Sequence, residues 1–298
     1  MVIFCVSPRG RFLEEGPDGR RVGVQEWVWA NFDVAKMEEL TIPRDLVLGS
    51  IDASRLISRK PKKPTVLFLH GLESGTNGRK ARYLKKKFPG SEAPDMQMSA
   101  LNPRKRNSPA KWLIPFAVVV MMSFSVVGYT SSLFQSCVFL SISAFMFVAL
   151  GRWRMKVALA ACVDVAVEAI ATATPTVLVG SSWGGAVALR CLELGHWQGP
   201  TVLLAPAVAT TGVFSLFWPS WRPTLPASVA AQCRIVQGER DRVVPAQVVK
   251  EMAKRNGICI ELFPDATHSL NEICLKGKGG LETFVMATVS QSKQKAKM

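Results

Sequence analysis

Histidine is scarce in this sequence, with only three among 298 residues, at positions 70, 196 and 268. They are dispersed, and the seven cysteines form no CxxC pair, so the sequence offers no cluster of the ligands that zinc prefers. We therefore expect no metal and no other cofactor. The scarcity also means that a reaction that needs an imidazole base must use His70, His196 or His268.

The sequence also lacks the usual marks of a secreted protein. Its cysteines are odd in number and irregularly spaced, which favours reduced thiols in a cytosol-like compartment. The stretch from Met1 to Val6 has no basic leader, and its apolar run is too short for a signal peptide. Secretion is therefore not predicted, and we expect the cysteines in apolar runs to be core residues without a catalytic role.

Acidic residues are few, with 22 against 37 lysines and arginines, which gives a net charge of +15. Many of the basic residues lie in four runs, at 59–63, 79–87, 104–106 and 293–297. No RNA- or DNA-binding motif accompanies them, so no nucleic-acid partner is expected. Basic runs near an apolar segment favour attraction to an anionic membrane surface, and the alternative is ordinary solvated surface charge.

An apolar segment of forty residues, 112–151, contains no charged residue. About 20 apolar residues span a bilayer as a helix. The segment therefore predicts two crossings, at 113–130 and 133–150, with a turn at 129–132. The alternative is a buried helical pair or an apolar lid within a soluble protein.

Both flanks of this segment are basic, with Arg104, Arg106 and Lys111 before it and Arg152 and Arg154 after it. The positive-inside rule then places both ends in the cytoplasm. We expect a multi-pass membrane protein that binds the membrane through residues 113–150, with its folded domain facing the cytoplasm. A channel is disfavoured, because two helices without intramembrane charges offer no ion pathway.

Outside this segment, short β-branched runs alternate with helical ones, which is typical of a parallel sheet covered by helices. Strands are expected at 65–70, 176–180, 201–205, 234–238 and 258–263, with a weaker candidate at 96–101. Helices are expected at 79–88, 156–172, 183–194, 245–255 and 279–290. The fold class is therefore α/β, with one main domain at this length.

The predicted organisation has four parts. Residues 1–63 form an N-terminal segment that ends in a basic linker, and residues 64–110 and 152–292 form the α/β domain. Residues 111–151 form the inserted hairpin, and residues 293–298 form a basic tail.

The clearest chemical motif is Gly180-Ser181-Ser182-Trp183-Gly184, which follows a Val-Leu-Val strand and precedes a helix. Such a turn holds a nucleophilic serine above the strand ends and is so tight that its flanking positions must be small. Gly180 and Gly184 supply that room. We therefore predict that Ser182 is a nucleophile.

A serine hydroxyl needs a base, and the base needs a carboxylate, in the chain order Ser, Asp, His after such a turn. His268 alone follows the last predicted strand, so it is the predicted base. Asp241 ends the penultimate strand and is the preferred carboxylate, with Asp265 as the competitor. Asp265 lies only three residues before His268 and better fits the loop that aims it.

Negative charge that develops on a substrate carbonyl requires two backbone N–H donors. One comes from the residue after the nucleophile and the other from the loop after the early strand, which predicts an oxyanion hole at Trp183 and Leu72. Gly71 lets the backbone approach closely. His70 is then expected to shape this loop and not to act as the base.

These motifs, with Leu69-His70-Gly71 and the sequence from Gly238 to Pro245, resemble the α/β-hydrolase superfamily over about 65–110 and 155–290. The segment from His70 to Gly75, Lys80-Ala81 and the elbow resemble the small YqiA-like esterases, and the acyl-protein thioesterase branch shares the elbow. The resemblance implies an α/β-hydrolase fold with a mostly parallel sheet. The apolar hairpin departs from both branches.

The sequence therefore favours a serine hydrolase that cleaves a carboxylic ester or thioester through an acyl-enzyme. If the hairpin leaves the carboxyl end of a strand, the active-site mouth lies near the membrane, which favours an apolar acyl substrate. Residues 214–221 are then a second apolar wall. The alternatives are a hairpin that only anchors the enzyme, and a membrane-anchored binding or scaffold protein without catalysis.

Overall fold

A computed structural model describes residues 5–6, 12–15, 21–23, 63–130, 133–212, 214–218, 221–275 and 280–295. The chain divides into two compact units, Met1–Pro61 and Lys62–Met298. In the first unit, β1 (Cys5–Val6), β2 (Phe12–Glu15) and β3 (Arg21–Gly23) form an antiparallel sheet in that order. The boundary between the units falls in the segment predicted as a basic linker.

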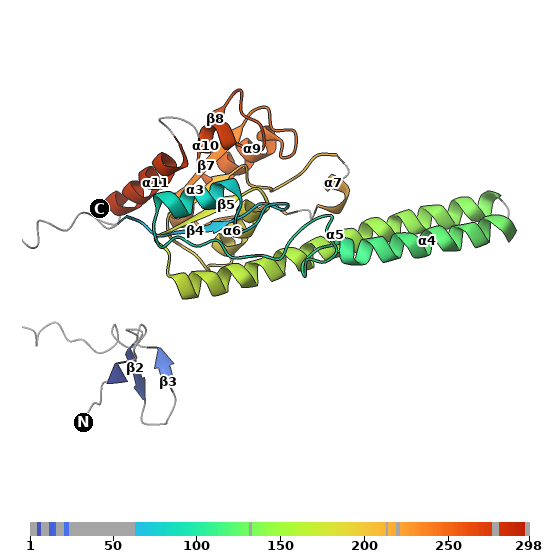
Figure 1. Ribbon diagram of the computed structural model, residues 1–298, viewed down its shortest axis with the longest axis horizontal. Helices are drawn as coiled ribbons and strands as arrows, with labels where there is room; N and C mark the ends of the chain where they lie inside the picture. Colours follow the sequence, from blue (N-terminus) through green and yellow to red (C-terminus); the bar gives the residue numbers. More distant parts are fainter. Residues whose placement is uncertain are drawn as a thin grey trace, which may run out of the picture. The chain divides into compact units, whose positions relative to one another are not determined.

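A parallel sheet of five strands forms the centre of the second unit (Figure 1). Its strands are β4 (Val66–Leu69), β5 (Val177–Ser181), β6 (Thr201–Leu204), β7 (Cys233–Gly238) and β8 (Cys259–Phe263), paired in that order. Every residue of β4, β5 and β6 is buried, as expected for strands covered on both faces. The predicted α/β class and these five strands are confirmed.

Two hydrophobic cores lie on the two faces of this sheet. Leu67, Leu178 and Leu203 point into one of them, whereas Val66 and Val202 point into the other. This alternation is the period-2 pattern of a strand with both faces buried. The helices that contribute to the cores are α3 (Arg79–Lys87), α5 (Leu133–Ala173), α6 (Trp183–Glu193), α8 (Ala227–Ala230), α9 (Ala246–Asn256), α10 (Asn271–Leu275) and α11 (Leu281–Lys295).

The helix α11 ends later than predicted. It continues to Lys295. The first three residues of the segment predicted as a basic tail are therefore helical.

The predicted strand at 96–101 is wrong. The backbone after α3 pairs with the edge of β4 at Glu92, which bonds Val66 and Phe68. Farther along, the N–H of Met96 donates to the His70 ring, and its carbonyl accepts from the Asn107 side chain at 2.7 Å. These backbone groups are satisfied by loop partners, so no second strand can pair there.

The apolar segment forms two helices, α4 (Ala110–Thr130) and α5, which run side by side and project away from the sheet in Figure 1. The predicted crossing at 133–150 and the predicted domain helix at 156–172 are one helix of 41 residues. Gly151 is the only weak helix former at their junction, and a single glycine costs only about 1 kcal/mol there. The helix therefore continues from the hairpin into the core.

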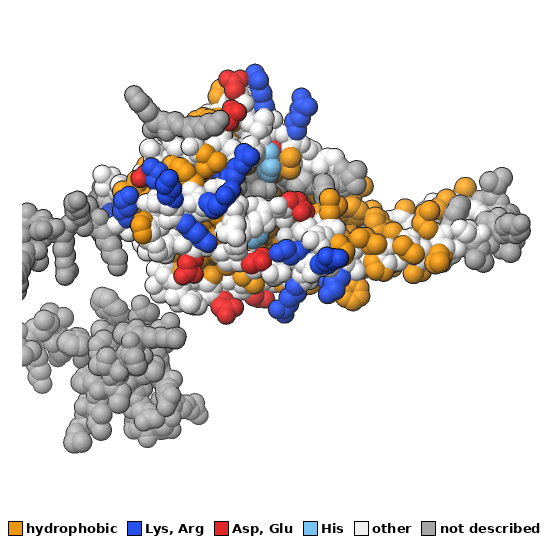
Figure 2. Space-filling view, viewed as in Figure 1, with side chains coloured by type: hydrophobic (Ala, Val, Ile, Leu, Met, Phe, Trp, Pro, Cys, Tyr) orange, Lys and Arg blue, Asp and Glu red, His pale blue; other side chains and the backbone are white. Residues whose placement is uncertain are grey.

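The two halves of α5 have different surroundings. In the second half, Met155, Cys162 and Ala166 are buried under the sheet. In the first half, apolar side chains such as Ile142 and Phe145 are exposed, as Val119 and Met121 are on α4. Figure 2 shows hydrophobic side chains gathered over the projecting pair. A contiguous apolar surface of this kind is rarely left exposed to water in a soluble protein.

Among the described residues, one helix is long and apolar enough to cross a membrane, judged by length and composition. It is α5 over Gln135–Ala173, with a mean hydropathy of 1.6 in its most apolar stretch. In α4, the apolar stretch whose side chains are described is Ala110–Ser123, which is shorter.

Candidate active site

The turn between β5 and α6 carries Ser182 in a conformation that non-glycine residues rarely adopt, with φ 53° and ψ −115°. Its N–H donates to Leu204 at the end of β6, and its carbonyl accepts from the N–H groups of Ala186 and Ala207. Three neighbouring segments therefore hold this backbone. The predicted sharp turn between strand and helix is present.

Two glycines allow this turn to approach its neighbours. A Cβ atom on Gly184 would lie 2.0 Å from the carbonyl oxygen of Leu69, so α6 rests directly on the end of β4. A Cβ atom on Gly180 would lie 2.5 Å from the carbonyl oxygen of Gly184. At Gly71, by contrast, a Cβ atom would make an ordinary contact of 3.4 Å with that of Ser182. Gly71 thus keeps space beside the serine without being required by backbone packing.

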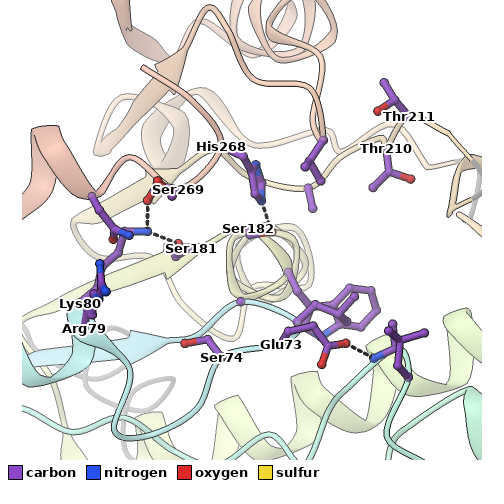
Figure 3. A pocket seen from close by; sticks show the side chains of 18 of the residues that line it. Glu73, Ser74, Arg79, Lys80, Ser181, Ser182, Thr210, Thr211, His268 and Ser269 are labelled. Atoms are coloured by element: carbon purple, nitrogen blue, oxygen red, sulfur yellow. Dashed lines mark hydrogen bonds between the residues drawn. The ribbon is translucent and has the colours of Figure 1, made fainter. Parts of the chain in front are cut away.

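His268 lies in the loop after β8 and contacts Ser182 and Asp241 with its two ring nitrogens. Its Nε2 atom is 2.9 Å from Oγ of Ser182 (Figure 3). Its Nδ1 atom is 2.8 Å from Oδ2 of Asp241. With the proton on Nδ1, the ring donates to the carboxylate and accepts from the serine hydroxyl. That is the arrangement in which an imidazole can act as a general base.

The Asp241 carboxylate is fully buried and accepts several hydrogen bonds. The N–H groups of Val243 and Val244 each donate to Oδ1 at 2.8 Å, and the amide of Gln237 donates to Oδ2 at 3.1 Å. Burial alone would raise the pKa of Asp241, but the hydrogen bonds from His268 and from the two backbone N–H groups outweigh it and lower the pKa. The group is therefore ionised near neutral pH.

The competing carboxylate, Asp265, points elsewhere. Its side chain is 85% exposed and forms an ion pair of 2.8 Å with Arg240. The structure thus brings Asp241, and not Asp265, to the imidazole of His268.

The two predicted oxyanion donors line the same cavity as Ser182. Trp183 is the first residue of α6, so its N–H has no acceptor within the helix. Within the described residues, no hydrogen bond is found from the N–H of Trp183 or from that of Leu72. Both groups are therefore available to a substrate oxygen.

The other two histidines are placed away from this arrangement. His70 is buried, its Nδ1 atom donates to the carbonyl of Gly71, and its Nε2 atom accepts from Met96. Burial lowers the pKa of His70, so the ring is neutral and holds the loop, as the sequence suggested. His196 is exposed after the end of α6.

Lys80 was not predicted as a site residue. Its Nζ atom donates to the carbonyl of Ser269 at 2.5 Å and to the hydroxyl of Ser181 at 3.3 Å, as Figure 3 shows. Burial lowers the pKa of Lys80. In the sequence it lies in a basic helical run, which is typical of a solvated surface. In the structure, Lys80 instead links Ser181, the residue before Ser182, to Ser269, the residue after His268.

A cavity of about 580 Å³ opens above Ser182 and His268. This volume lies in the range of small-molecule sites. Its walls include the apolar side chains of Leu72, Leu101 and Trp218. The carboxylate of Glu73 also lines the cavity, but this carboxylate already accepts hydrogen bonds from Ser99 Oγ at 2.8 Å and from the N–H of Ala100 at 2.6 Å.

The described cysteines offer no nucleophile at this site. Burial raises the pKa of Cys191 and of Cys233 to about 12, so both thiols stay protonated near neutral pH. Over the described ranges, no group of three or more His, Cys, Asp or Glu side chains is arranged to hold a metal ion.

The parallel sheet, the strained turn after β5 and the cavity above the strand ends define an α/β-hydrolase fold. Residues 153–294 match the family model described as an alpha/beta hydrolase domain, somewhat under half of the chain. The superfamily assignment made from the motifs is thereby confirmed, and the match supports a hydrolase. No curated protein matches the sequence, so the resemblance to a particular branch stays a prediction.

Solved structures of similar proteins include an alpha/beta-superfamily protein from Xanthomonas campestris pv. campestris. It is 18% identical, the match covers 80% of this chain and 99% of that one, and the TM-score is 0.42. The ydeN gene product from B. subtilis is 15% identical, with coverages of 76% and 98% and a TM-score of 0.41. An esterase from Exiguobacterium antarcticum is 13% identical, with coverages of 78% and 93% and a TM-score of 0.41.

Proposed function

We propose that this chain is a serine hydrolase that cleaves a carboxylic ester or thioester through an acyl-enzyme. The observation that carries the proposal is the unbroken series of short contacts from Ser182 Oγ to His268 and from His268 to Asp241. It joins a hydroxyl, an imidazole and a buried carboxylate in the order that proton transfer requires.

In the first half of the reaction, Ser182 Oγ attacks the substrate carbonyl carbon while its proton passes to Nε2 of His268. The N–H groups of Leu72 and Trp183 receive the negative oxygen of the tetrahedral intermediate. When the intermediate collapses, the bond to the leaving alcohol or thiol breaks, and His268 returns the proton to it. Water then repeats the sequence on the acyl-enzyme and releases the acid.

A fluorophosphonate probe tests the nucleophile. The variant Ser182→Ala should lose labelling, because the probe requires an activated hydroxyl. The matched control is Ser181→Ala, which removes the neighbouring hydroxyl that Lys80 binds and should still be labelled. Equal labelling of Ser182→Ala and wild type would refute the assignment.

The rival hypothesis is a binding or scaffold protein that keeps this fold without turnover. A neutral ester such as p-nitrophenyl butyrate separates the two. Hydrolysis by purified protein should be lost in His268→Ala and kept in His196→Ala, because the second imidazole is exposed after the end of α6. Absence of turnover for every ester and thioester offered would favour the scaffold.

For the cellular site, we propose that α4 and the first part of α5 cross a membrane as a two-helix hairpin, with the α/β domain in the cytoplasm. The root of the hairpin supports this, because the Arg154 guanidinium lies 5.1 Å from the ring of Trp112 and 5.3 Å from that of Trp153. Tryptophan with a basic residue is typical of the cytoplasmic interface of a membrane. A hairpin also returns the chain to the side from which it came.

Two exposed cysteines make this orientation measurable, Cys137 near the start of α5 and Cys259 in β8. In single-cysteine variants, an impermeant maleimide added to the cytoplasmic side of sealed membranes should label Cys259 but not Cys137. Labelling of both, or full extraction of the protein by alkaline carbonate, would show that the hairpin does not span the membrane.

The proposed substrate is an apolar acyl compound supplied by the membrane. Support comes from Leu101, which lines the cavity above Ser182 and begins the short connection to α4. Trp218, from the stretch predicted as a second apolar wall, lines the same cavity. The alternative is a hairpin that only localises the enzyme.

A further inference from the structure

A second cavity, of about 320 Å³, lies at the root of the hairpin. It is lined by Leu113, Ile114 and Ala117 of α4, by Phe147 and Met155 of α5, and by Phe217 of α7 (Phe214–Phe217). Among the residues that the structure describes, no charged or polar side chain lines it. An apolar cavity gives water no hydrogen-bond partners and accepts apolar ligands instead.

This cavity adjoins the one above Ser182. Ala100 and Leu101 line both cavities. Phe217 lines the second cavity, and the next residue, Trp218, lines the cavity above Ser182. The backbone at this junction is fixed, because the N–H of Ala100 donates to Glu73 at 2.6 Å. Leu101 is nevertheless 72% exposed. It therefore has room to move aside between the two cavities.

The outer wall of the second cavity, formed by α7, packs against α5. The ring of Phe217 packs edge-on against Phe147, with centroids 5.5 Å apart, and lies against the backbone of Gly151. The side chain of Arg152 donates to the carbonyl of Leu216 at 2.8 Å. These contacts bind α7 to α5, so the cavity is a formed feature of the domain.

We infer that the acyl chain of the substrate runs from Ser182 past Leu101 into this second cavity, and that the substrate is a long-chain acyl ester or thioester. The inference rests on the proposed function, because the acyl carbonyl must lie at Ser182. Short acyl groups fill only the first cavity, whereas longer ones reach between α4, α5 and α7. The hairpin thus contributes directly to substrate binding.

Chain-length selectivity is the expected sign of this site. Burial of one methylene group improves binding by about fourfold, so kcat/KM should rise at each step that extends the chain into the second cavity. The assay compares p-nitrophenyl esters from acetate to palmitate, with the full chain in micelles of one mild detergent. Because every variant is given the same micelles, ratios between variants cancel the partitioning of the ester.

The test variant is Ala117→Phe, which fills the second cavity from α4. Its matched control is Val118→Phe, the next residue, which is 51% exposed and lines neither cavity. Ala117→Phe should lower kcat/KM for the laurate and palmitate esters by about tenfold or more and leave the acetate ester within about twofold. Val118→Phe should leave both within about twofold of wild type.

The outcomes separate this inference from the proposed function. Cleavage that depends on Ser182 but shows no chain-length preference, or equal loss of both ester classes in Ala117→Phe, would overturn the acyl-chain site and leave the hydrolase intact. Retained acetate cleavage in Ala117→Phe also shows that the variant folds. No cleavage by wild type of any ester, or of the acyl thioesters of the same chain lengths, would overturn the proposed function and, with it, the acyl-chain site.

Discussion

Replacement of Asp241 by asparagine changes one oxygen of the carboxylate to an NH₂ group, and the surrounding hydrogen bonds determine which oxygen is replaced. Oδ1 accepts from the N–H groups of Val243 and Val244, so the amide oxygen must remain there. The NH₂ group then takes the position of Oδ2, 2.8 Å from Nδ1 of His268. Two donors cannot face each other, so Nδ1 must become the acceptor and the proton moves to Nε2.

The new tautomer cannot act as a base, because Nε2 now donates toward Ser182 and has no lone pair for the hydroxyl proton. A triad with this defect loses about 10⁴ in kcat, or about 5 kcal/mol of transition-state stabilisation. KM should change little, because the walls of the cavity are intact. The fold should also survive, because the side-chain amide of Gln237 can rotate so that its buried oxygen, which has no partner, accepts a hydrogen bond from the NH₂ group of the new asparagine.

The assay is the steady-state hydrolysis of p-nitrophenyl butyrate, with thermal unfolding as the control for folding. Asp265→Asn is the matched variant, because that carboxylate is exposed and bonds Arg240, and its kcat should stay within about twofold of wild type. The reasoning fails if Asp241→Asn keeps more than about a tenth of wild-type kcat. It also fails if Asp265→Asn loses as much.

Three further outcomes follow from the site. Gly184→Ala should lower the free energy of unfolding in urea by about 3 kcal/mol or more, because its Cβ atom would meet the Leu69 carbonyl at 2.0 Å. Gly75→Ala, with nothing within 4 Å, should change that free energy by less than about 0.5 kcal/mol, and similar losses in both would contradict the packing argument. Lys80→Met should lower kcat by about tenfold or more with KM for a neutral ester nearly unchanged, whereas an equal change in KM would argue against a positioning role. Because the folded pKa of Asp241 is lowered, its stabilisation is present above pH ~4 and is lost as the pH falls further, through the folded pKa. Tm of wild type should therefore fall more steeply than that of Asp241→Asn below about pH 4, and parallel curves would contradict this.

The five strands and the positions of Ser182, Asp241 and His268 were predictable from the sequence because local signals specify them. A short β-branched run that ends in glycines is typical of a parallel strand followed by a tight turn. Chain order then left one suitable histidine. The structure brings these three side chains together from the ends of three strands, β5, β7 and β8, and no local pattern describes that meeting.

Three features could not be predicted from local sequence patterns. The strand expected at 96–101 fails because loop partners such as Asn107 take up the backbone groups, and such partners are invisible in a propensity pattern. The role of Lys80 depends on contacts with Ser181 and Ser269, which are about 100 and 190 residues away in the sequence. The second cavity exists only where α4, α5 and α7 meet.

The continuity of α5 means that the projecting hairpin and the α/β domain share one rigid helix. At 1.5 Å per residue, its 41 residues extend about 60 Å without a hinge. Near the inner end, the thiol of Cys162 accepts a hydrogen bond from the indole of Trp183, which follows Ser182. A flexible tether would let the α/β domain tumble relative to the hairpin. The continuous helix instead fixes the orientation of the domain relative to the hairpin, so any tilt of the hairpin is transmitted directly to the turn that carries Ser182.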